Sequence, residues 1–205
     1  AEEYRLVGVD NLNSPPAPRN SVIDGNFFIK PQEMPIEALR VIGGCHSLIR
    51  GKYGQLIGDS LEASAFTSMK FKLRDSQAEH QRANISILKT YYFSSDLRRM
   101  TSLCKIEGEE HIFALMKGAP ETVAELLDQV PPNYFETCRS YTRQGCRVLS
   151  LAFREMTNMT PSKFDPHVSR NDVECHMKFA GFIIFSAAIK RGSEDTIAEL
   201  LRTMH

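Results

Sequence analysis

The stretch Met116-Lys117-Gly118-Ala119-Pro120-Glu121 follows a run, residues 111–116, whose side chains alternate as in a β-strand. This strand would carry Lys117 at its end. Gly118 would allow a tight turn and, having no Cβ, would let a planar ligand approach the backbone closely. The proline and the glutamate that follow suit the first turn of a helix. A lysine beside a glycine turn and a helix start suits an anionic ligand. The alternative is an ordinary strand–helix connection with a surface lysine.

Other segments predict the sheet to which this strand belongs. Residues 100–106 turn at Glu107-Gly108-Glu109 and return as residues 111–117, which predicts an antiparallel hairpin. Residues 85–93 alternate as in a strand with one covered face, and residues 179–185 are apolar on both faces, as in the interior of a sheet. Further strands are expected at 4–9, 55–57 and 147–153, helices at 35–50, 61–69, 120–130, 132–144 and from Ser193, a short helix around 161–168, and a loop at 74–83. The fold class expected is α+β, an antiparallel β-sheet flanked by helices.

Composition excludes several classes of protein. The 205 residues include 25 basic and 25 acidic side chains, so no overall attraction to nucleic acid is expected. Five dispersed cysteines without a C-x-x-C pair indicate neither a zinc site nor a disulfide framework. The apolar run 179–189 is too short to span a bilayer, and the polar start of the chain lacks the features of a signal peptide. If the parent protein is a membrane protein, this piece is expected not to contact the membrane.

The common nucleotide and hydrolase motifs are missing. Gly44, Gly51 and Lys52 imitate a phosphate-binding P-loop only loosely, because the spacing is wrong and Tyr53 replaces the Ser/Thr. There is no G-x-G-x-x-G, no G-x-S-x-G and no H-E-x-x-H. A nucleotide hydrolase of a common self-sufficient type is therefore not indicated.

Three more stretches could contribute to an anion or nucleotide site. In residues 93–100, Phe93 at a strand end could stack on a purine while Arg98 or Arg99 meets phosphate, or Phe93 could belong to the core. In residues 145–149, Arg147 opens a buried strand and could equally be a surface residue. In residues 58–62, the alternative is plain helix capping by Asp59 or Ser60.

Together these four stretches resemble the nucleotide-binding domain of P-type ATPases, in which the same elements occur in this order. The resemblance covers nearly the whole chain. It is most specific in Lys117-Gly118-Ala119-Pro120-Glu121 and in Phe93-Ser94-Ser95-Asp96-Leu97-Arg98-Arg99-Met100.

The resemblance implies six nucleotide-binding positions: Glu62, Phe93, Arg98, Lys117, Gly118 and Arg147. The aromatic ring would stack on adenine, Glu62 would approach the base, and the lysine of the Lys-Gly motif would lie at the foot of the adenine pocket. Arg98 stands where many members have lysine and would contact the nucleotide, while Arg147 would reach phosphate or ribose.

Finer features resemble subgroup A of the type V P-type ATPases, the Spf-type transporters of the endoplasmic reticulum. These are the residues 117–122, 131–134, 143–149 and 179–185. That branch is described both as dislocating transmembrane helices and as transporting cations. Where it normally carries Cys-Pro-Leu-Lys, this chain has Ala187-Ala188-Ile189-Lys190.

The resemblance also implies a division of the chain and a set of partners. Residues 1–20 would be a margin of the phosphorylation domain and the first hinge, 21–177 the nucleotide-binding domain, and 178–205 the second hinge and the return to the phosphorylation domain. The ligand would be ATP, with Mg²⁺ bound to the triphosphate. The partners would be the phosphorylation and actuator domains of a multi-pass protein, and this would be its cytosolic domain, at the endoplasmic reticulum. The aspartate-bearing Asp-Lys-Thr-Gly-Thr segment is missing, so this piece alone should only bind nucleotide.

Two alternatives remain at this point. One is a protein-interaction module whose Phe93 groove receives a peptide or helix. The other is a free-standing phosphohydrolase, which needs a nucleophilic aspartate with a second aspartate two residues on, and the chain contains no D-x-D.

Overall fold

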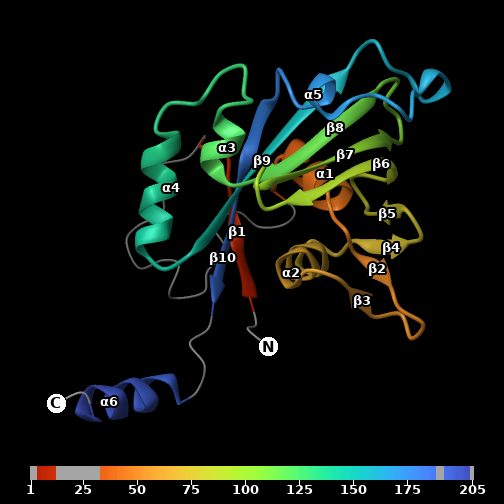
Figure 1. Ribbon diagram of the computed structural model, residues 1–205. Helices are drawn as coiled ribbons and strands as arrows, with labels where there is room; N and C mark the ends of the chain where they lie inside the picture. Colours follow the sequence, from red (N-terminus) through yellow and green to blue (C-terminus); the bar gives the residue numbers. More distant parts are fainter. Residues whose placement is uncertain (1–3, 13–32, 188–191, 204–205) are drawn as a thin grey trace.

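A computed structural model describes residues 4–12, 33–187 and 192–203 (Figure 1). Residues 13–20, in the expected first hinge region, and residues 188–190, in the second, lie outside them. The elements are β1 (Tyr4–Asp10), α1 (Ile36–Gly44), β2 (Ile49–Arg50), β3 (Leu56–Ile57), α2 (Ser60–Ser68), β4 (Lys72–Arg74), β5 (Gln77–Glu79), β6 (Ile85–Ser94), β7 (Arg99–Ile106), β8 (Ile112–Gly118), α3 (Pro120–Ala124), α4 (Tyr134–Arg143), β9 (Arg147–Met156), η1 (Pro161–Lys163), α5 (Arg170–Val173), β10 (Lys178–Ala187) and α6 (Ser193–Thr203). None of the helices in these ranges is long and apolar enough to cross a membrane.

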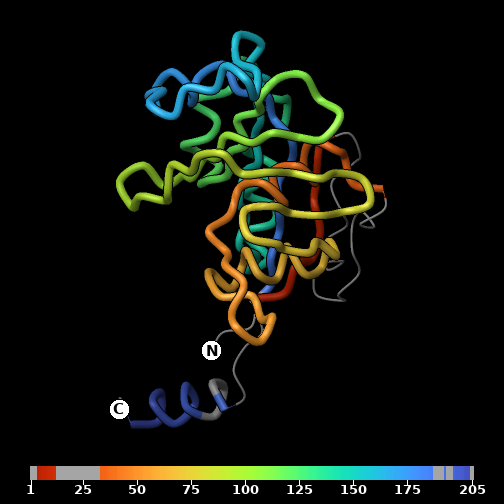
Figure 2. The backbone as a smooth tube through the Cα atoms, turned by 90° about the vertical axis from the view of Figure 1, so that its right-hand side faces the viewer, coloured from red at the N-terminus to blue at the C-terminus, as the bar shows by residue number. Residues whose placement is uncertain are grey.

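The main sheet has eight strands in the order β1-β10-β9-β8-β7-β6-β5-β4, and each neighbouring pair is antiparallel. The first and last strands of the chain pair with each other, Tyr4 opposite Ala187. In the side view of Figure 2 the turn between β6 and β7 projects from the body, and the small β2–β3 hairpin (orange) projects below it. The predicted α+β class with an antiparallel sheet is confirmed.

Helices cover both faces of the sheet, and β10 shows why. Ile183 and Phe185 join the core beneath α1 and α2, whereas Phe182 and Ile184 join a second core beneath α4. Successive residues of a strand point to opposite faces, so a central strand covered on both sides must be apolar throughout. The prediction that residues 179–185 lie inside the sheet is confirmed, because β10 lies between β1 and β9.

The hairpin of residues 100–117 is found as β7 and β8, and the 61–69 helix as α2. The 35–50 helix is wrong in length, since α1 already ends at Gly44. At its end the two glycines lie against the sheet: a Cβ on Gly43 would come within 2.4 Å of Phe71, and one on Gly44 within 2.5 Å of Leu115. These glycines therefore permit close packing inside the helix, where sequence alone suggests only weakness.

Tertiary pairing shortens the predicted 120–130 helix, because α3 ends at Ala124. Leu127 instead forms a bridge with Met177, and the Asp128 amide donates to the Met177 carbonyl. The predicted 132–144 helix is found as α4, but its buried face carries Tyr134 rather than Phe135, which is 42% exposed. Around 161–168 only the short η1 forms.

In the 74–93 region one prediction is wrong, and the other is confirmed as a strand but not in its regular alternation. The expected loop at 74–83 contains β5 and the end of β4, three-residue strands whose short apolar signal comes from Leu73 and Ala78. The strand at 85–93 exists as β6, but bulges after Ile87 and Tyr91 interrupt its alternation. As a result Ile87 packs on the α1 side and Tyr91 on the opposite side of the sheet.

Candidate functional site

A cavity of about 590 Å³ opens where α1, α2, the β6–β7 turn and the starts of α3 and β9 meet. Its volume lies within the range usual for small-molecule sites. All six positions singled out from the sequence line it: Glu62, Phe93, Arg98, Lys117, Gly118 and Arg147. Apolar side chains, among them Ile42, Leu149 and Phe185, complete its walls.

The floor of the cavity is an ion pair between a strand and a helix. Lys117 Nζ at the end of β8 donates to Glu62 Oε1 of α2 over 2.6 Å, and both side chains are largely buried. Glu62 Oε2 accepts from the backbone amide and the hydroxyl of Ser47. Burial raises the pKa of Glu62, but the Lys117 ammonium and these hydrogen bonds outweigh burial and lower the pKa overall. The carboxylate is therefore ionised and held in one place.

Helix capping in this region is done by Asp59, as the alternative reading proposed. Asp59 Oδ1 accepts from the amides of Leu61 and Glu62 at the start of α2. The cap fixes the first helical turn and, with it, the backbone from which Glu62 reaches Lys117.

Two buried side chains lie beneath this floor. Burial raises the pKa of the Cys45 thiol to about 11, and its Sγ donates to the Met100 carbonyl. Burial, together with the nearby Lys117 charge, lowers the pKa of His46 to about 4. His46 Nδ1 accepts from the Leu48 amide, so the ring is neutral and structural at neutral pH.

The rim of the cavity, formed by Phe93, Arg98 and Arg147, differs from the floor in burial and charge pairing. Phe93, the last residue but one of β6, is 62% exposed, so the core role considered from the sequence is wrong. Arg98 has φ 47° in the turn that follows, where its amide donates to Ser94 and its carbonyl accepts from Ala119. Within the described ranges, neither Arg98 nor Arg147 forms an ion pair. Two arginines without an ion-pair partner in these ranges thus line the same cavity as an exposed aromatic ring.

Gly118 needs to be glycine for a different reason from the one expected. Its φ is not left-handed, and a Cβ there would meet the Arg98 carbonyl oxygen at 2.7 Å and Arg99 Cβ at 2.8 Å. The missing side chain allows β7 to approach β8. The close approach of a ligand to its backbone stays a prediction, and the residue does line the cavity.

Sequence reasoning missed Ser47 and Tyr92, which also line the cavity. Tyr92 adjoins Phe93 and is 68% exposed, so an aromatic pair at a strand end could have signalled it. Nothing local marks Ser47, because its role depends on Glu62, fifteen residues further along.

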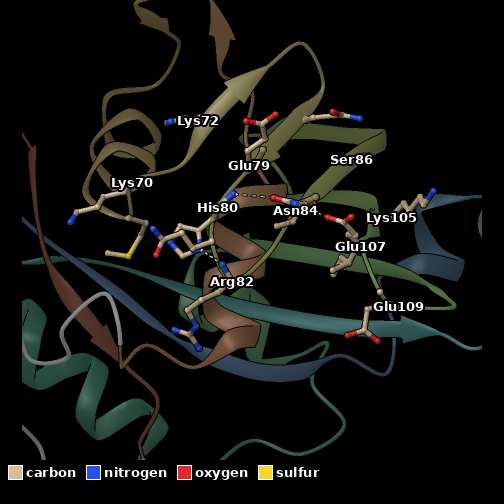
Figure 3. A pocket seen from close by; sticks show the side chains of 17 residues that line it. Lys70, Lys72, Glu79, His80, Arg82, Asn84, Ser86, Lys105, Glu107 and Glu109 are labelled. Atoms are coloured by element: carbon tan, nitrogen blue, oxygen red, sulfur yellow. Dashed lines mark hydrogen bonds between the residues drawn. The ribbon is translucent and has the colours of Figure 1, made fainter.

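A larger hollow of about 980 Å³ lies elsewhere, between the end of α2, β5 and the β7–β8 turn (Figure 3). It is lined by side chains of both signs, and several of its polar groups pair with each other, as Asn84 does with Glu107. At its edge Glu109 also pairs with Arg40. Despite its size, it contains none of the residues singled out from the sequence.

Comparison with known proteins identifies the family. Residues 45–190 match the family model described as "P-type ATPase, cytoplasmic domain N". The chain is 36% identical over 177 residues to "Probable manganese-transporting ATPase PDR2" of Arabidopsis thaliana, which is 84% of this chain and 15% of that protein. It is 34% identical over 175 residues to "Endoplasmic reticulum transmembrane helix translocase" of Saccharomyces cerevisiae, which is 84% of this chain and 14% of that protein.

A shorter match is "Polyamine-transporting ATPase 13A3" of Mus musculus, 36% identical over 118 residues that make up 57% of this chain and 10% of that protein. The chain therefore spans only a small part of the length of its relatives. Helix translocases of the endoplasmic reticulum are among them, as the likeness to the Spf-type branch predicted. Because the family model covers most of the chain, the chain belongs to the P-type ATPases and corresponds to their cytoplasmic domain N.

Proposed function

We propose that this chain binds ATP in the cavity between α2 and the β6–β7 turn, and presents the γ-phosphate to an aspartate on an adjacent phosphorylation domain. One observation carries the proposal. Six residues scattered from position 62 to position 147, each implied by the resemblance, line a single cavity.

The two parts of the cavity suit the two ends of ATP. The exposed ring of Phe93 offers a stacking surface for adenine above the apolar wall, with Lys117 and Glu62 beneath it. Arg98 and Arg147 carry charge without an ion-pair partner in the described chain and would hold the phosphates. Mg²⁺ would come with the triphosphate.

In this proposal the domain aligns a substrate and breaks no bond itself. Phosphoryl transfer depends mainly on alignment and on charge stabilisation, so a domain that only presents ATP contributes to the rate through geometry. The nucleotide must also leave in every cycle, and binding by this chain alone should therefore be weak.

We infer further that residues 1–20 and 178–205 lead to the phosphorylation domain, with the nucleotide-binding domain at 21–177. The pairing of β1 with β10 supports a shared exit, since Tyr4 and Ala187 lie side by side where the two chain ends leave the sheet. Both strands are at the same time part of the main sheet, so the structured body extends from β1 to β10. The parent would be a multi-pass ATPase of the type V subgroup A kind, at the endoplasmic reticulum. It would work with its own actuator domain, on a transported substrate that membrane segments select.

The test is an NMR titration of the ¹⁵N-labelled chain with Mg-ATP, in which the chemical shifts of the backbone amides are monitored. Saturable shifts should concentrate at Phe93, Arg98 and Lys117, with no release of inorganic phosphate. A spectrum that does not change at these residues would refute ATP binding and favour an interaction module. Steady phosphate release by the chain would instead favour a free-standing phosphohydrolase.

A further inference from the structure

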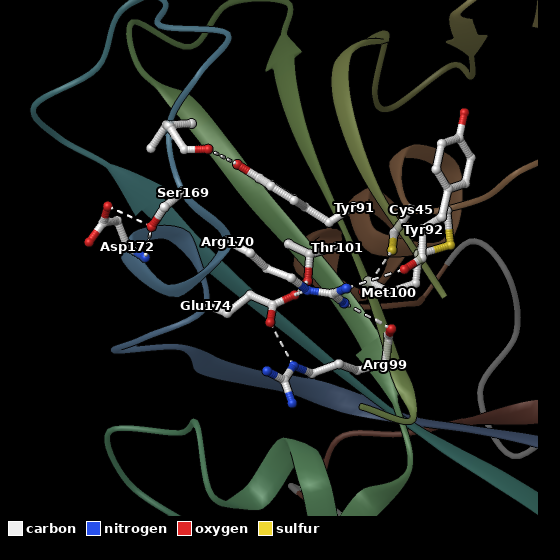
Figure 4. A network of polar contacts seen from close by, with 11 residues as sticks. Cys45, Tyr91, Tyr92, Arg99, Met100, Thr101, Ser169, Arg170, Asp172 and Glu174 are labelled. Carbon is white, nitrogen blue, oxygen red and sulfur yellow. Dashed lines mark hydrogen bonds and ion pairs between the residues drawn. The ribbon is translucent and has the colours of Figure 1, made fainter. Parts of the chain in front are cut away.

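A buried polar cluster lies on the opposite face of the sheet from the cavity (Figure 4). Its centre is Glu174, just after α5, whose side chain is 1% exposed. The carboxylate accepts from Arg99 Nε over 2.6 Å, from Thr101 Oγ1 over 2.5 Å and from Arg170 Nε over 2.8 Å. Met100, between the two β7 residues, lines the cavity on the other face.

Arg170 connects this cluster to the backbone of the β6–β7 turn. Its Nη1 donates to the Tyr92 carbonyl over 3.3 Å, and its Nη2 donates to the Arg99 carbonyl over 3.0 Å. These two carbonyls bracket residues 93–98, the segment that carries Phe93 and Arg98 into the cavity. A single guanidinium therefore bridges both ends of the turn.

Arg170 contacts β6 at a β-bulge, where the regular pairing of β6 with β7 is interrupted. Tyr91 pairs with Thr101 and Ser94 pairs with Arg99, so two residues of β6 stand opposite the single residue Met100. In such a bulge, part of the backbone lacks its usual ladder partner and the strand bends. Arg170 supplies a charged donor to the Tyr92 carbonyl at this point.

Other contacts hold the segment before α5 against the same strand. Tyr91 Oη donates to the Val168 carbonyl, and Lys89 Nζ donates to the carbonyls of Pro166 and Val168. Ser169 caps α5 by accepting from the Asp172 amide. The guanidinium of Arg170 is thus carried by a segment that is itself anchored to β6.

We propose that Arg170, held by Glu174, is a positioning residue for the nucleotide site: it fixes the bulged turn in the conformation that presents Phe93 and Arg98. This rests on the proposed function, since it assigns a task to those two side chains. Without the bridge, the turn would occupy its binding-competent conformation for only part of the time. Apparent affinity falls in proportion to that fraction.

The test variant is Arg170→Lys. Lysine can keep the ion pair with Glu174, but a single nitrogen cannot also span both carbonyls. The dissociation constant for Mg-ATP should rise about fivefold, as expected if the competent conformation falls to about a fifth of the population. Arg154→Lys is the matched control: Arg154 Nη1 bonds the carbonyls of Asp172 and Cys175 in the same segment and touches neither end of the turn. It should bind ATP like the wild type.

A double-mutant cycle separates positioning from general weakening. If Arg170 acts through Phe93, the substitution Arg170→Lys should lower ATP affinity much less in a Phe93→Ala background than in the wild-type background. Equal effects in both backgrounds, or unchanged affinity in Arg170→Lys, would overturn the proposal. Glu174→Gln, which loosens the same guanidinium, should weaken ATP binding in the same direction and serves if Arg170→Lys fails to fold.

A readout without nucleotide distinguishes this proposal from the one on which it rests. In the ligand-free chain, Arg170→Lys should shift or broaden the amide signals of residues 92–98, while Arg154→Lys leaves them in place. If the wild type fails to bind ATP but these signals respond, the proposed function is wrong and the bridge is real. If ATP binds and these signals do not respond, the bridge is wrong.

Discussion

The floor and the rim of the cavity are built on opposite principles. On the floor, Lys117 and Glu62 neutralise each other, are largely buried, and are carried by the end of β8 and the first turn of α2. On the rim, Phe93 is mostly exposed, and the Arg98 and Arg147 charges have no ion-pair partner within the described chain. The floor is complete without a ligand, whereas the rim has unused capacity for one.

This difference separates stability from binding. A residue whose partners lie within the protein contributes to folding, and its loss leaves a buried group uncompensated. A residue whose surface is still exposed contributes little to folding and can give its whole interaction to a ligand. Substitutions in the floor should therefore change unfolding, and substitutions at the rim should change affinity.

The largest effect should come from breaking the floor. Lys117→Met leaves the Glu62 carboxylate buried without its cation and should lower the free energy of unfolding by about 3 kcal/mol, measured by urea titration. Lys72→Met, at an exposed position of β4, is the matched control and should be nearly neutral. The double variant Lys117→Met with Glu62→Gln should recover much of the loss. If Lys117→Met is as stable as the control, the floor is not a structural pair.

The next effect concerns pH. The folded pKa of His46, about 4, lies below its ordinary value of 6.5, so the unfolded chain binds a proton between these values while the folded chain does not. The stability that the neutral His46 ring contributes is therefore fully present above pH 6.5 and is lost as pH falls towards 4. Lowering the pH from about 7 to 5 should reduce the free energy of unfolding by about 2 kcal/mol through His46 alone.

His46→Asn tests the sign, because its side-chain oxygen can still accept from the Leu48 amide but does not titrate in this range. Its unfolding free energy should fall by about 2 kcal/mol less than that of the wild type over the same pH interval. Parallel curves for wild type and His46→Asn would contradict the assignment.

At the rim, Phe93→Ala should weaken Mg-ATP binding about tenfold, as expected for the loss of one stacked base. Its unfolding free energy should change by no more than about 0.5 kcal/mol, because the ring is 62% exposed. Calorimetric titration and urea unfolding measure the two quantities. Phe135→Ala, an aromatic residue 42% exposed and outside the cavity, should leave ATP affinity unchanged.

The smallest effect should be that of a single rim charge. Arg147→Ala should weaken Mg-ATP binding about threefold at low salt, and the difference should shrink as salt screens the exposed charge. Arg139→Ala removes an exposed arginine of α4 outside the cavity and provides the comparison. A loss for Arg147→Ala that does not depend on salt would indicate a packing role instead.

The parts of the fold that the sequence predicted are those with long, regular apolar patterns. Residues 179–185 and the 100–117 hairpin carry enough repeats for their strands to be recognised, and both are present. The 35–50 helix is predicted too long because the apolar spacing continues to Ile49, which lies in β2 instead. The three-residue strands β4 and β5 carry too few residues to show a period.

The residues of the candidate site were connected to one another by the family resemblance, because no periodic pattern in the sequence relates them. Phe93 and Lys117 are far apart in sequence, and only the pairing of β6 with β7 and of β7 with β8 places them at one cavity. The contribution of Ser47, Arg170 and Glu174 could not be predicted, because each acts on a partner that is remote in the chain. The bulge after Tyr91 likewise leaves no sign in the alternating sequence.

The pairing of Tyr4 with Ala187 has a mechanical consequence. A pulling force applied between these two residues would peel β1 from β10 one hydrogen bond at a time, because in an antiparallel pair they sit at the same open end. The load would enter the sheet at that corner, two residues from Phe185, whose side chain lines the cavity. It would therefore act on the apolar wall of the cavity before it reached β6 to β8.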